Sequence, residues 1–284
     1  MKIAEHWKDY EILATGDGQK LERWGNTMLL RPDPQIIWRT EVDMEKHQGL
    51  NAVYKRYSDG GGNWTVKKSF PESWTIKYKN HTFMIKPTGF KHTGLFPEQA
   101  VNWDMMESLI KKSGKVSVLN LFAYTGAASV VCAAAGAQVT HVDAAKGMVE
   151  RAKENARLNN IDNIRYIIDD CLKFVTREKK RGHFYDAIIM DPPSYGRGPN
   201  GEMWKLEDSI FELAKSCAEL LSPTPLFYLI NSYTTGLQPS VMGNILKLVT
   251  KKFIGHIEAY EVVLPTKEGI VLPCGASAVF IGER

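Results

Sequence analysis

Long apolar runs are absent from this chain of 284 residues. No stretch of it approaches the ~20 consecutive apolar residues that a membrane-spanning helix needs. Its first eight residues, MKIAEHWK, also lack the apolar stretch of a signal peptide. We therefore expect neither a membrane segment nor a membrane partner.

Cysteine is scarce and scattered. The chain has four cysteines, Cys132, Cys171, Cys217 and Cys274, and no two of them form a Cys-x-x-Cys pair. This spacing offers neither a zinc site nor a disulfide framework. We expect a reduced, cytoplasmic protein that holds no metal, while the sequence leaves its oligomeric state open.

A glycine-rich phosphate loop is also missing. The apolar run 116–122 predicts a buried strand, and the turn that follows it, Phe122-Ala123-Tyr124-Thr125-Gly126, contains a single glycine. A pyrophosphate requires several glycine amides at close range. The turn therefore lacks the usual dinucleotide fingerprint, although it leads from a strand into a helix.

The pattern of predicted strands and helices changes after about residue 90. Before it, the short apolar runs 27–30, 36–38 and 75–78 predict strands of a small β-rich domain, which we assign to residues 1–88. From residue 117 onward, strands and helices alternate, as in a parallel sheet covered by helices. The predicted strands are 116–122, 138–142, 164–168, 187–190 and 226–230; the predicted helices are 127–135, 146–159, 171–180, 202–221 and 239–252. The last two runs, 257–264 and 270–281, predict an antiparallel hairpin that completes a second domain, 89–284.

Tryptophan and positive charge are slightly concentrated in the N-terminal domain. Five of the seven tryptophans lie in residues 1–90, where 14 Lys and Arg stand against 11 Asp and Glu, while the whole chain has a net charge of +4. Tryptophan can supply core area in a small sheet, or it can stack on bases. The small basic excess permits contact with RNA, so we expect this domain to help hold RNA and to contribute nothing to cofactor binding.

Acidic residues stand at the ends of three predicted strands. Asp143 ends the second, Asp170 lies just past the third, and Asp191 ends the fourth. Ligands of doubly wound sheets bind at this carboxyl edge. Asp143 can accept both hydroxyls of a ribose, and Asp170 can accept an adenine amino group while the Cys171 N–H donates to a ring nitrogen. The alternative is that these carboxylates only cap helices.

The fourth strand runs into Asp191-Pro192-Pro193-Ser194-Tyr195. Proline has a fixed φ and no N–H group, so such a turn holds its carbonyls in place, partly unpaired. The turn suits a site that grips the polar edge of a flat substrate, with Tyr195 as a stacking wall. A plain turn at the end of a buried strand is the alternative.

Several runs together carry a resemblance to a known family. They are 118–126 (VLNLFAYTG), 141–146 (HVDAAK), 169–174 (DDCLKF), 191–198 (DPPSYGRG) and 89–99 (GFKHTGLFPEQ). They resemble the motifs of class I methyltransferases of the 23S rRNA cytosine-C5 and guanine-N7 type. Residues 1–88 are similar to the N-terminal region of an uncharacterised, mostly bacterial branch without a PUA domain.

This resemblance implies a Rossmann-like class I methyltransferase fold, with a seven-stranded sheet that ends in an antiparallel hairpin. It implies S-adenosylmethionine as the cofactor and a base of ribosomal RNA as the target. In the family, the segment 89–99 covers the methionine end of the cofactor. The expected cofactor residues are Phe96, Gln99, Asn120, Phe122, Tyr124, Thr125, Gly126, Asp143, Ala144, Asp170, Cys171 and Asp191. Asp191, Pro192 and Tyr195 are the expected catalytic residues, with Cys274 as a fourth candidate.

The reaction type depends on Cys274. A nitrogen target needs only acceptors and a stacking wall, whereas cytosine C5 requires a cysteine thiolate that adds to the ring first. Cys274 is the best thiol for that role, but in the cytosine-C5 relatives we expect the cysteine nearer Ser277. Ser194 also separates the second proline from its aromatic residue, unlike the usual pattern of exocyclic-amine methyltransferases. We favour nitrogen narrowly.

Three classes of function remain open. The first is an RNA methyltransferase. The second is a methyltransferase that acts on a small molecule or a protein, which suits the modest basicity. The third is a non-catalytic module that binds the cofactor and RNA; the intact acidic strand ends and the intact Asp-Pro-Pro turn argue against it.

Overall fold

The computed structural model describes residues 1–57, 61–89, 91–197 and 203–283. The chain divides into two compact units. The sheet unit comprises Asn102–Val262 and Gly275–Arg284 with Met1, and the N-terminal unit comprises Lys2–Val101 and Val263–Cys274. The domain boundary that the sequence predicts after residue 88 stays a prediction.

The large sheet has eight strands in the order β1-β16-β17-β15-β12-β9-β10-β11. Their bounds are β1 Lys2–Ile3, β9 Ser117–Leu121, β10 Gln138–Asp143, β11 Ile164–Ile168, β12 Ala187–Met190, β15 Phe227–Ser232, β16 Gly255–Pro265 and β17 Val271–Gly282. Strands β9 to β12 and β15 run parallel, and β17 lies antiparallel to β15. Seven of these are the predicted strands, and the two-residue β1 is an addition at the edge.

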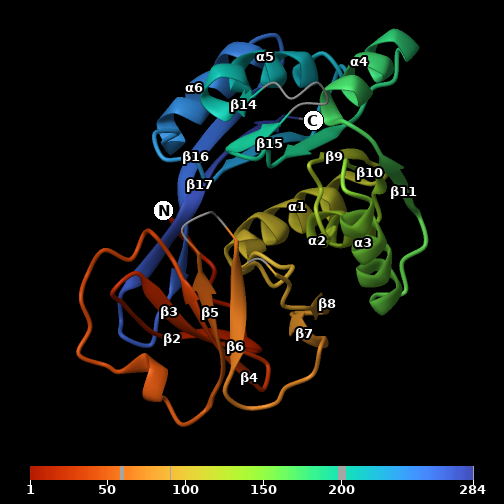
Figure 1. The fold of residues 1–284 in the computed structure, drawn as a ribbon. Helices are drawn as coiled ribbons and strands as arrows, with labels where there is room; N and C mark the ends of the chain where they lie inside the picture. Colours follow the sequence, from red (N-terminus) through yellow and green to blue (C-terminus); the bar gives the residue numbers. More distant parts are fainter. Residues whose placement is uncertain (58–60, 90, 198–202, 284) are drawn as a thin grey trace. The chain divides into compact units, whose positions relative to one another are not determined.

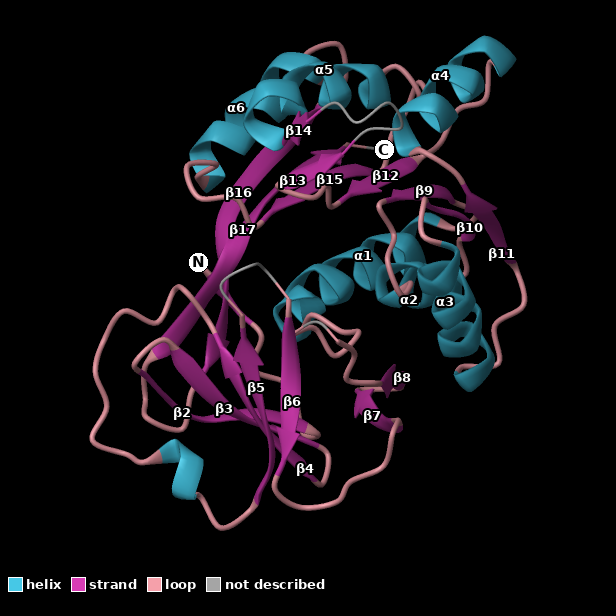
Figure 2. Cartoon of the chain, in the orientation of Figure 1, coloured by secondary structure: helices cyan, strands magenta, loops and turns pink. Residues whose placement is uncertain are grey.

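Helices cover both faces of this sheet, with α4, α5 and α6 on one face and α1, α2 and α3 on the other (Figures 1 and 2). Their bounds are α1 Ala100–Ser113, α2 Ala127–Ala134, α3 Lys146–Leu158, α4 Cys171–Arg181, α5 Leu206–Ala218 and α6 Pro239–Val249. Every residue of β12 and β15 is buried, as expected for parallel strands covered on both sides. Residues from β9, β12 and β15 pack with α4, α5 and α6 into one apolar core.

The N-terminal unit is built on a five-stranded sheet in the order β2-β3-β4-β5-β6, with a separate β7-β8 pair. The bounds are β2 Tyr10–Gly16, β3 Gln19–Trp24, β4 Thr27–Pro32, β5 Leu50–Arg56, β6 Gly62–Val66, β7 Trp74–Tyr78 and β8 His81–Ile85, with 3-10 turns at η1 Met44–Lys46 and η2 Pro97–Gln99. Strands β4 and β5 pair in parallel, whereas the other neighbours in the sheet are antiparallel. Leu21, Leu30, Leu50 and Val53 form its core.

Two local predictions were wrong, and one helix was not predicted. Residues 36–38 are not a strand, because the carbonyls of Ile36 and Trp38 accept the N–H groups of Gly18 and Asp17 in the β2–β3 turn. Helix α1 was not predicted. The helix expected from residue 202 begins at Leu206, since the short strands β13 Tyr195–Arg197 and β14 Met203–Lys205 pair before it.

No helix in the described part of the chain is both long and apolar enough to cross a membrane.

Candidate active site

The turn after β9 has an unusual backbone conformation. Phe122 and Tyr124 have φ angles of 55° and 50°, and Gly126 has φ of 78°. Left-handed backbone costs a non-glycine residue roughly 1–2 kcal/mol, and such residues gather at functional sites. At Gly126 a Cβ atom would also lie 2.7 Å from the Cβ of Ala152 on α3. This position therefore needs glycine for both its φ angle and its close packing.

Two neighbouring elements hold the turn. The Tyr124 N–H donates to Asp143 Oδ2 at 2.8 Å, and the Phe122 N–H donates to the Cys171 sulfur at 3.3 Å. These contacts join the end of β9 to the end of β10 and to the first turn of α4. Asp143 and Cys171 thus support the shape of the turn.

Asp143 keeps acceptor capacity beyond this supporting contact. Its Oδ1 accepts the Ala145 N–H at 2.8 Å, so each oxygen accepts a main-chain donor. A carboxylate oxygen has a second lone pair, which can accept a ligand hydroxyl. The side chain is half-buried and Ala144 beside it is exposed. Asp143 can therefore accept hydroxyl donors at this edge of the sheet.

Asp170 and Cys171 form the start of α4. Asp170 Oδ1 accepts the Lys173 N–H at 2.9 Å, which is the helix-capping role considered as an alternative. Cys171 is buried, and burial raises the pKa of its thiol to about 12. As the first residue of α4, Cys171 has an N–H without an intrahelical acceptor. Its main chain, and not its sulfur, is the part of Cys171 that suits a ligand.

Asn120 and Thr125 are almost fully buried. The Asn120 amide donates to Ser129 Oγ at 2.9 Å, and that oxygen lies 3.0 Å from His141 Nδ1. Burial lowers the pKa of His141 to about 4, so the ring is neutral near pH 7. The Thr125 carbonyl accepts the Asn155 amide at 2.8 Å. These bonds fasten α2 to β9 and β10, and α3 to the turn after β9.

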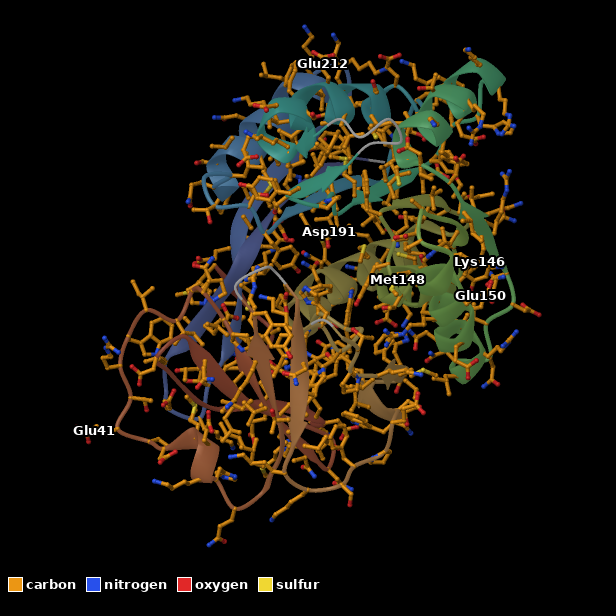
Figure 3. All side chains as sticks on the ribbon, in the orientation of Figure 1. Glu41, Lys146, Met148, Glu150, Asp191 and Glu212 are labelled. Carbon is orange, nitrogen blue, oxygen red and sulfur yellow. The ribbon has the colours of Figure 1, made fainter. Side chains whose placement is uncertain are left out.

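The Asp-Pro-Pro turn stands at the same edge. Strand β9 lies between β10 and β12, and the register aligns their ends, so Asp143 and Asp191 emerge two strands apart, at about 10 Å. Figure 3 labels Asp191, and on α3 it labels Lys146, Met148 and Glu150. Asp191 is half-buried, Pro192 is buried, and Tyr195 is 65% exposed. The structure thus brings Phe122, Asp143 and Asp191 together on one sheet edge.

The carbonyls of this turn are only partly available. The Trp204 indole donates to the Pro193 oxygen at 2.9 Å, and the Leu206 N–H donates to the Ser194 oxygen at 3.1 Å. Thr234, just past β15, donates its hydroxyl to Ser194 Oγ at 2.6 Å. Ser194, which interrupts the usual spacing to the aromatic residue, therefore anchors the turn. Gly198 of the same motif lies outside the described residues.

Ile168 was not among the residues predicted from the sequence. It ends β11, pairs with Asp143 in the register and is 49% exposed. An exposed aliphatic side chain beside the proposed ribose acceptor suits the flat face of an adenine. Its place as the last residue of the third strand, just before Asp169-Asp170, was the available signal.

The remaining predicted residues belong to the N-terminal unit. Phe96 precedes η2 and lies 5.4 Å from the ring of His92, while Gln99 ends η2 and is buried. Cys274 donates its thiol to the Leu272 carbonyl at 3.4 Å. Burial and the Glu98 carboxylate raise the pKa of the Cys274 thiol well above its ordinary value.

Ser277, where the cytosine-C5 relatives suggest a cysteine, is fully buried in the sheet unit. Its hydroxyl donates to Asn231 Oδ1 at 2.6 Å and accepts from Asn102 at 3.0 Å. The Tyr260 hydroxyl donates to Asn102 at 2.6 Å. This network joins α1, β15, β16 and β17, so Ser277 has a structural role.

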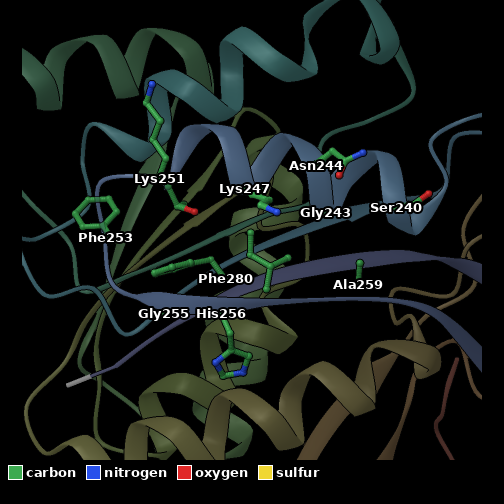
Figure 4. A pocket seen from close by; sticks show the side chains of 12 residues that line it. Ser240, Gly243, Asn244, Lys247, Lys251, Phe253, Gly255, His256, Ala259 and Phe280 are labelled. Carbon is green, nitrogen blue, oxygen red and sulfur yellow. The ribbon is translucent and has the colours of Figure 1, made fainter.

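A pocket elsewhere in the sheet unit contains none of the predicted residues. It lies between α6 and β16, and Lys247, Lys251, His256 and Phe280 are among the side chains that line it (Figure 4). In the ranges that the structure describes, no group of three or more His, Cys, Asp or Glu side chains is placed to hold a metal ion.

The carboxyl edge suits a nucleoside cofactor without phosphate groups. Its first turn has one glycine, and its nearest charged group is the Asp143 carboxylate, which accepts hydroxyls and repels phosphate. S-adenosylmethionine has a ribose diol and no phosphate, so these residues fit it. A dinucleotide would lack its usual amide cradle here.

Comparisons with known proteins agree with this chemistry. Residues 38–241 match the family model described as S-adenosylmethionine-dependent methyltransferase. The crystal structure of the SAM-dependent methyltransferase from Agrobacterium tumefaciens is 34% identical, covers 98% of this chain and 91% of its own, and has a TM-score of 0.91.

Two curated relatives come from Shewanella frigidimarina (strain NCIMB 400). Ribosomal RNA large subunit methyltransferase K/L is 37% identical over 146 residues, which are 50% of this chain and 20% of that protein. Ribosomal RNA large subunit methyltransferase I is 29% identical over 194 residues, 65% of this chain and 45% of that protein. The chain therefore spans less than half the length of either relative. The predicted fold class and cofactor are confirmed, and the chain belongs to the S-adenosylmethionine-dependent methyltransferase family.

Proposed function

We propose that this enzyme methylates a base of large-subunit ribosomal RNA in the cytoplasm. The observation that carries the proposal is the alignment of Asp143 and Asp191 on one sheet edge, on either side of the strained turn after β9. That edge combines a ribose acceptor with a turn suited to a flat substrate. The names of the curated relatives support ribosomal RNA as the target.

The cofactor residues follow the order of the strands. Asp143 accepts the ribose hydroxyls, with Ala144 beside it and Ile168 against the adenine. Asp170, through the oxygen that does not cap α4, and the Cys171 N–H hold the adenine edge. The turn that contains Phe122, Tyr124 and Gly126 contacts the central part of the cofactor. The buried Asn120 and Thr125 do not contact it and act by keeping that turn in place. Phe96 and Gln99 hold the methionine end.

Bound S-adenosylmethionine supplies an electrophilic methyl group on its sulfonium. The protein's part is to hold the target in line with that methyl group and to exclude water. Asp191 accepts a hydrogen bond from the target amine. This bond orients the amine so that the nitrogen lone pair faces the methyl group. Tyr195, which is 65% exposed on β13, stacks on the base. The buried Pro192 fixes the backbone that carries both.

A nitrogen target fits this site better than cytosine C5. A C5 reaction needs a thiolate, and the raised pKa of the Cys274 thiol keeps it protonated near pH 7. Ser277 cannot replace it, because its hydroxyl is committed to Asn231 and has no exposed surface. Asp191 can accept a hydrogen bond from an amine without any such covalent step.

The test uses the purified enzyme with methyl-labelled S-adenosylmethionine. Large-subunit ribosomal RNA from a strain that lacks the gene should take up label, whereas RNA from the parent strain should take up little because the site is already methylated. Nucleoside mass spectrometry then identifies the modified base. Label in the protein or metabolite fraction, with none in RNA, would instead favour a protein or small-molecule methyltransferase.

A further inference from the structure

Two cross-strand neighbours in the N-terminal unit hold the chain at the start of the segment 89–99, which resembles the cofactor cover. Tyr54 on β5 pairs with Trp64 on β6, and their rings are 5.3 Å apart. The Trp64 indole donates to the Thr88 carbonyl at 2.8 Å, and the Tyr54 hydroxyl donates to the Gly89 carbonyl at 3.1 Å. A side-chain pair on one ladder thus binds two consecutive carbonyls.

The glycine at position 62 makes room for this arrangement. A Cβ atom there would lie 2.5 Å from the Tyr54 hydroxyl and 2.4 Å from the Lys55 carbonyl. Tyr54 itself is 3% exposed, so its hydroxyl cannot move aside into solvent. The β6 backbone therefore approaches closely enough to keep the hydroxyl directed at Gly89.

A third donor comes from a buried ion pair. Arg31 Nε and Nη2 donate to Glu22 at 2.6 and 2.8 Å, and Glu22 also accepts the Tyr10 hydroxyl at 2.6 Å. The remaining terminal nitrogen, Nη1, donates to the Lys91 carbonyl at 2.8 Å. Because the carboxylate holds one side of the guanidinium, the other side is directed at a fixed point.

A fourth donor holds the far end. The Trp7 indole donates to the Pro97 carbonyl at 2.9 Å, inside η2. The Lys86 N–H, from just before the first clamped carbonyl, donates to the Thr93 carbonyl at 2.9 Å and closes the loop on itself. Phe96 directly precedes Pro97, and Gln99 lies two residues after it in η2.

All four donors act on main-chain carbonyls and none on a side chain of the segment. The tryptophans in this set are therefore committed internally, as are two others: the Trp74 indole donates to the Trp24 carbonyl, and the Trp38 indole donates to Thr15 Oγ1. Trp24 has no exposed surface. The density of tryptophan in this unit thus serves packing and hydrogen bonding within the unit.

We propose that Tyr54, Trp64, Arg31 and Trp7 are positioning residues, which clamp the backbone at Thr88, Gly89, Lys91 and Pro97 so that Phe96 and Gln99 are preorganised for the cofactor. This inference rests on the proposed function in one respect, namely that Phe96 and Gln99 bind the methionine end of the cofactor. It replaces the expectation that residues 1–88 contribute nothing to cofactor binding.

The test compares two double variants of the full chain. Tyr54→Phe/Trp64→Phe removes two clamp donors and keeps the aromatic bodies. Trp38→Phe/Trp74→Phe removes two indole donors of the same unit that do not reach the segment, and serves as the matched control. The readouts are amide hydrogen exchange of residues 86–99 and the Kd for S-adenosylhomocysteine by calorimetry.

For the clamp variant we expect faster exchange in residues 86–99 and a Kd raised about 5- to 30-fold, since two hydrogen bonds are lost. The control should leave both values unchanged. Trp7→Phe, a milder second variant, should raise the Kd about 5-fold. These variants should change the Kd and KM for the cofactor more than kcat at saturation.

Three outcomes separate the clamp, the segment's role and the cofactor assignment. Unchanged exchange in the clamp variant, or an equal effect in the control, would overturn the clamp. Faster exchange with an unchanged Kd would mean that the clamp exists but the segment does not hold the cofactor, which overturns the roles of Phe96 and Gln99. Wild-type protein that does not bind S-adenosylhomocysteine would overturn the cofactor assignment itself.

Discussion

In the sheet unit, Asp143 and Asp170 accept main-chain N–H groups, whereas the clamp residues of the N-terminal unit donate to main-chain carbonyls. Asp143 accepts two backbone donors and Asp170 caps a helix, so these carboxylates shape the loops beside them. Trp64 and Arg31, by contrast, reach across the unit to carbonyls far along the chain. The carboxylates of the first arrangement stand at strand ends, where the sequence makes them recognisable, whereas the donors of the second are scattered along the chain and form no motif.

The largest effect should come from Asp191, at the reacting end of the sheet edge. We expect Asp191→Ala to lower the methyl-transfer rate by about 10²–10⁴, because the amine loses its acceptor. The Kd for S-adenosylhomocysteine should change much less. Asp208→Ala, which removes an exposed carboxylate of α5, is the control. Full activity of Asp191→Ala would mean that the active site lies elsewhere.

Replacing Asp143 should change the affinity for the cofactor more than the rate of methyl transfer. Each hydrogen bond to a charged carboxylate contributes about 1.5–3 kcal/mol, so Asp143→Ala should raise the cofactor Kd by at least about tenfold. Calorimetry with S-adenosylhomocysteine measures this change. Asp162→Ala, in the exposed loop before β11, should leave the Kd unchanged. Equal affinities of Asp143→Ala and wild type would remove Asp143 from the ribose.

The buried pair of the N-terminal unit should make stability depend on pH. Burial alone would raise the pKa of Glu22, but Arg31 and Lys20 outweigh it and lower that pKa to about 2, below its ordinary value of 4.5. A lowered folded-state pKa stabilises the protein above the unfolded pKa, and this contribution is lost as the pH falls from about 4.5 towards 2. The loss is up to about 3 kcal/mol.

Chemical denaturation between pH 6 and pH 3 measures this dependence. Glu22→Gln should flatten it, and should also destabilise the protein at pH 7 by about 3–5 kcal/mol because Arg31 loses its buried partner. Glu72→Gln, which removes an exposed partner of Lys86, should behave like wild type. The same steep pH dependence in Glu22→Gln and wild type would refute the assignment to Glu22.

The smallest effect should come from Cys274. Because its thiol is held protonated, Cys274→Ser should keep methyl-transfer activity within about threefold of wild type. RNA that carries 5-fluorocytosine should form no stable adduct with the wild-type enzyme. An inactive Cys274→Ser together with a trapped adduct would establish a cytosine-C5 reaction.

Much of the sheet unit was predictable because its signals are local. Apolar runs that end in Asp143 or Asp191 mark parallel strands covered on both faces, and the single glycine at 126 excludes a phosphate loop before any coordinates are known. Ile168 and the α1 helix were missed, because the role of an exposed isoleucine or of an amphipathic run depends on the residues that lie next to it in space. The three-residue strands β13 and β14 are too short to produce a pattern.

The sequence by itself determined the family, the alternation of strands and helices along the parallel part of the large sheet, and the strand ends that present carboxylates, because these depend on residues close together in the chain. Only the tertiary structure decided which hydrogen bonds individual side chains make within the fold. Cys171 became a buried support, Asn120 an internal donor and Trp64 a clamp on Thr88, 24 residues away. The physical reason is that a side chain's hydrogen-bond partner and burial are set by elements distant in sequence, which local composition does not encode.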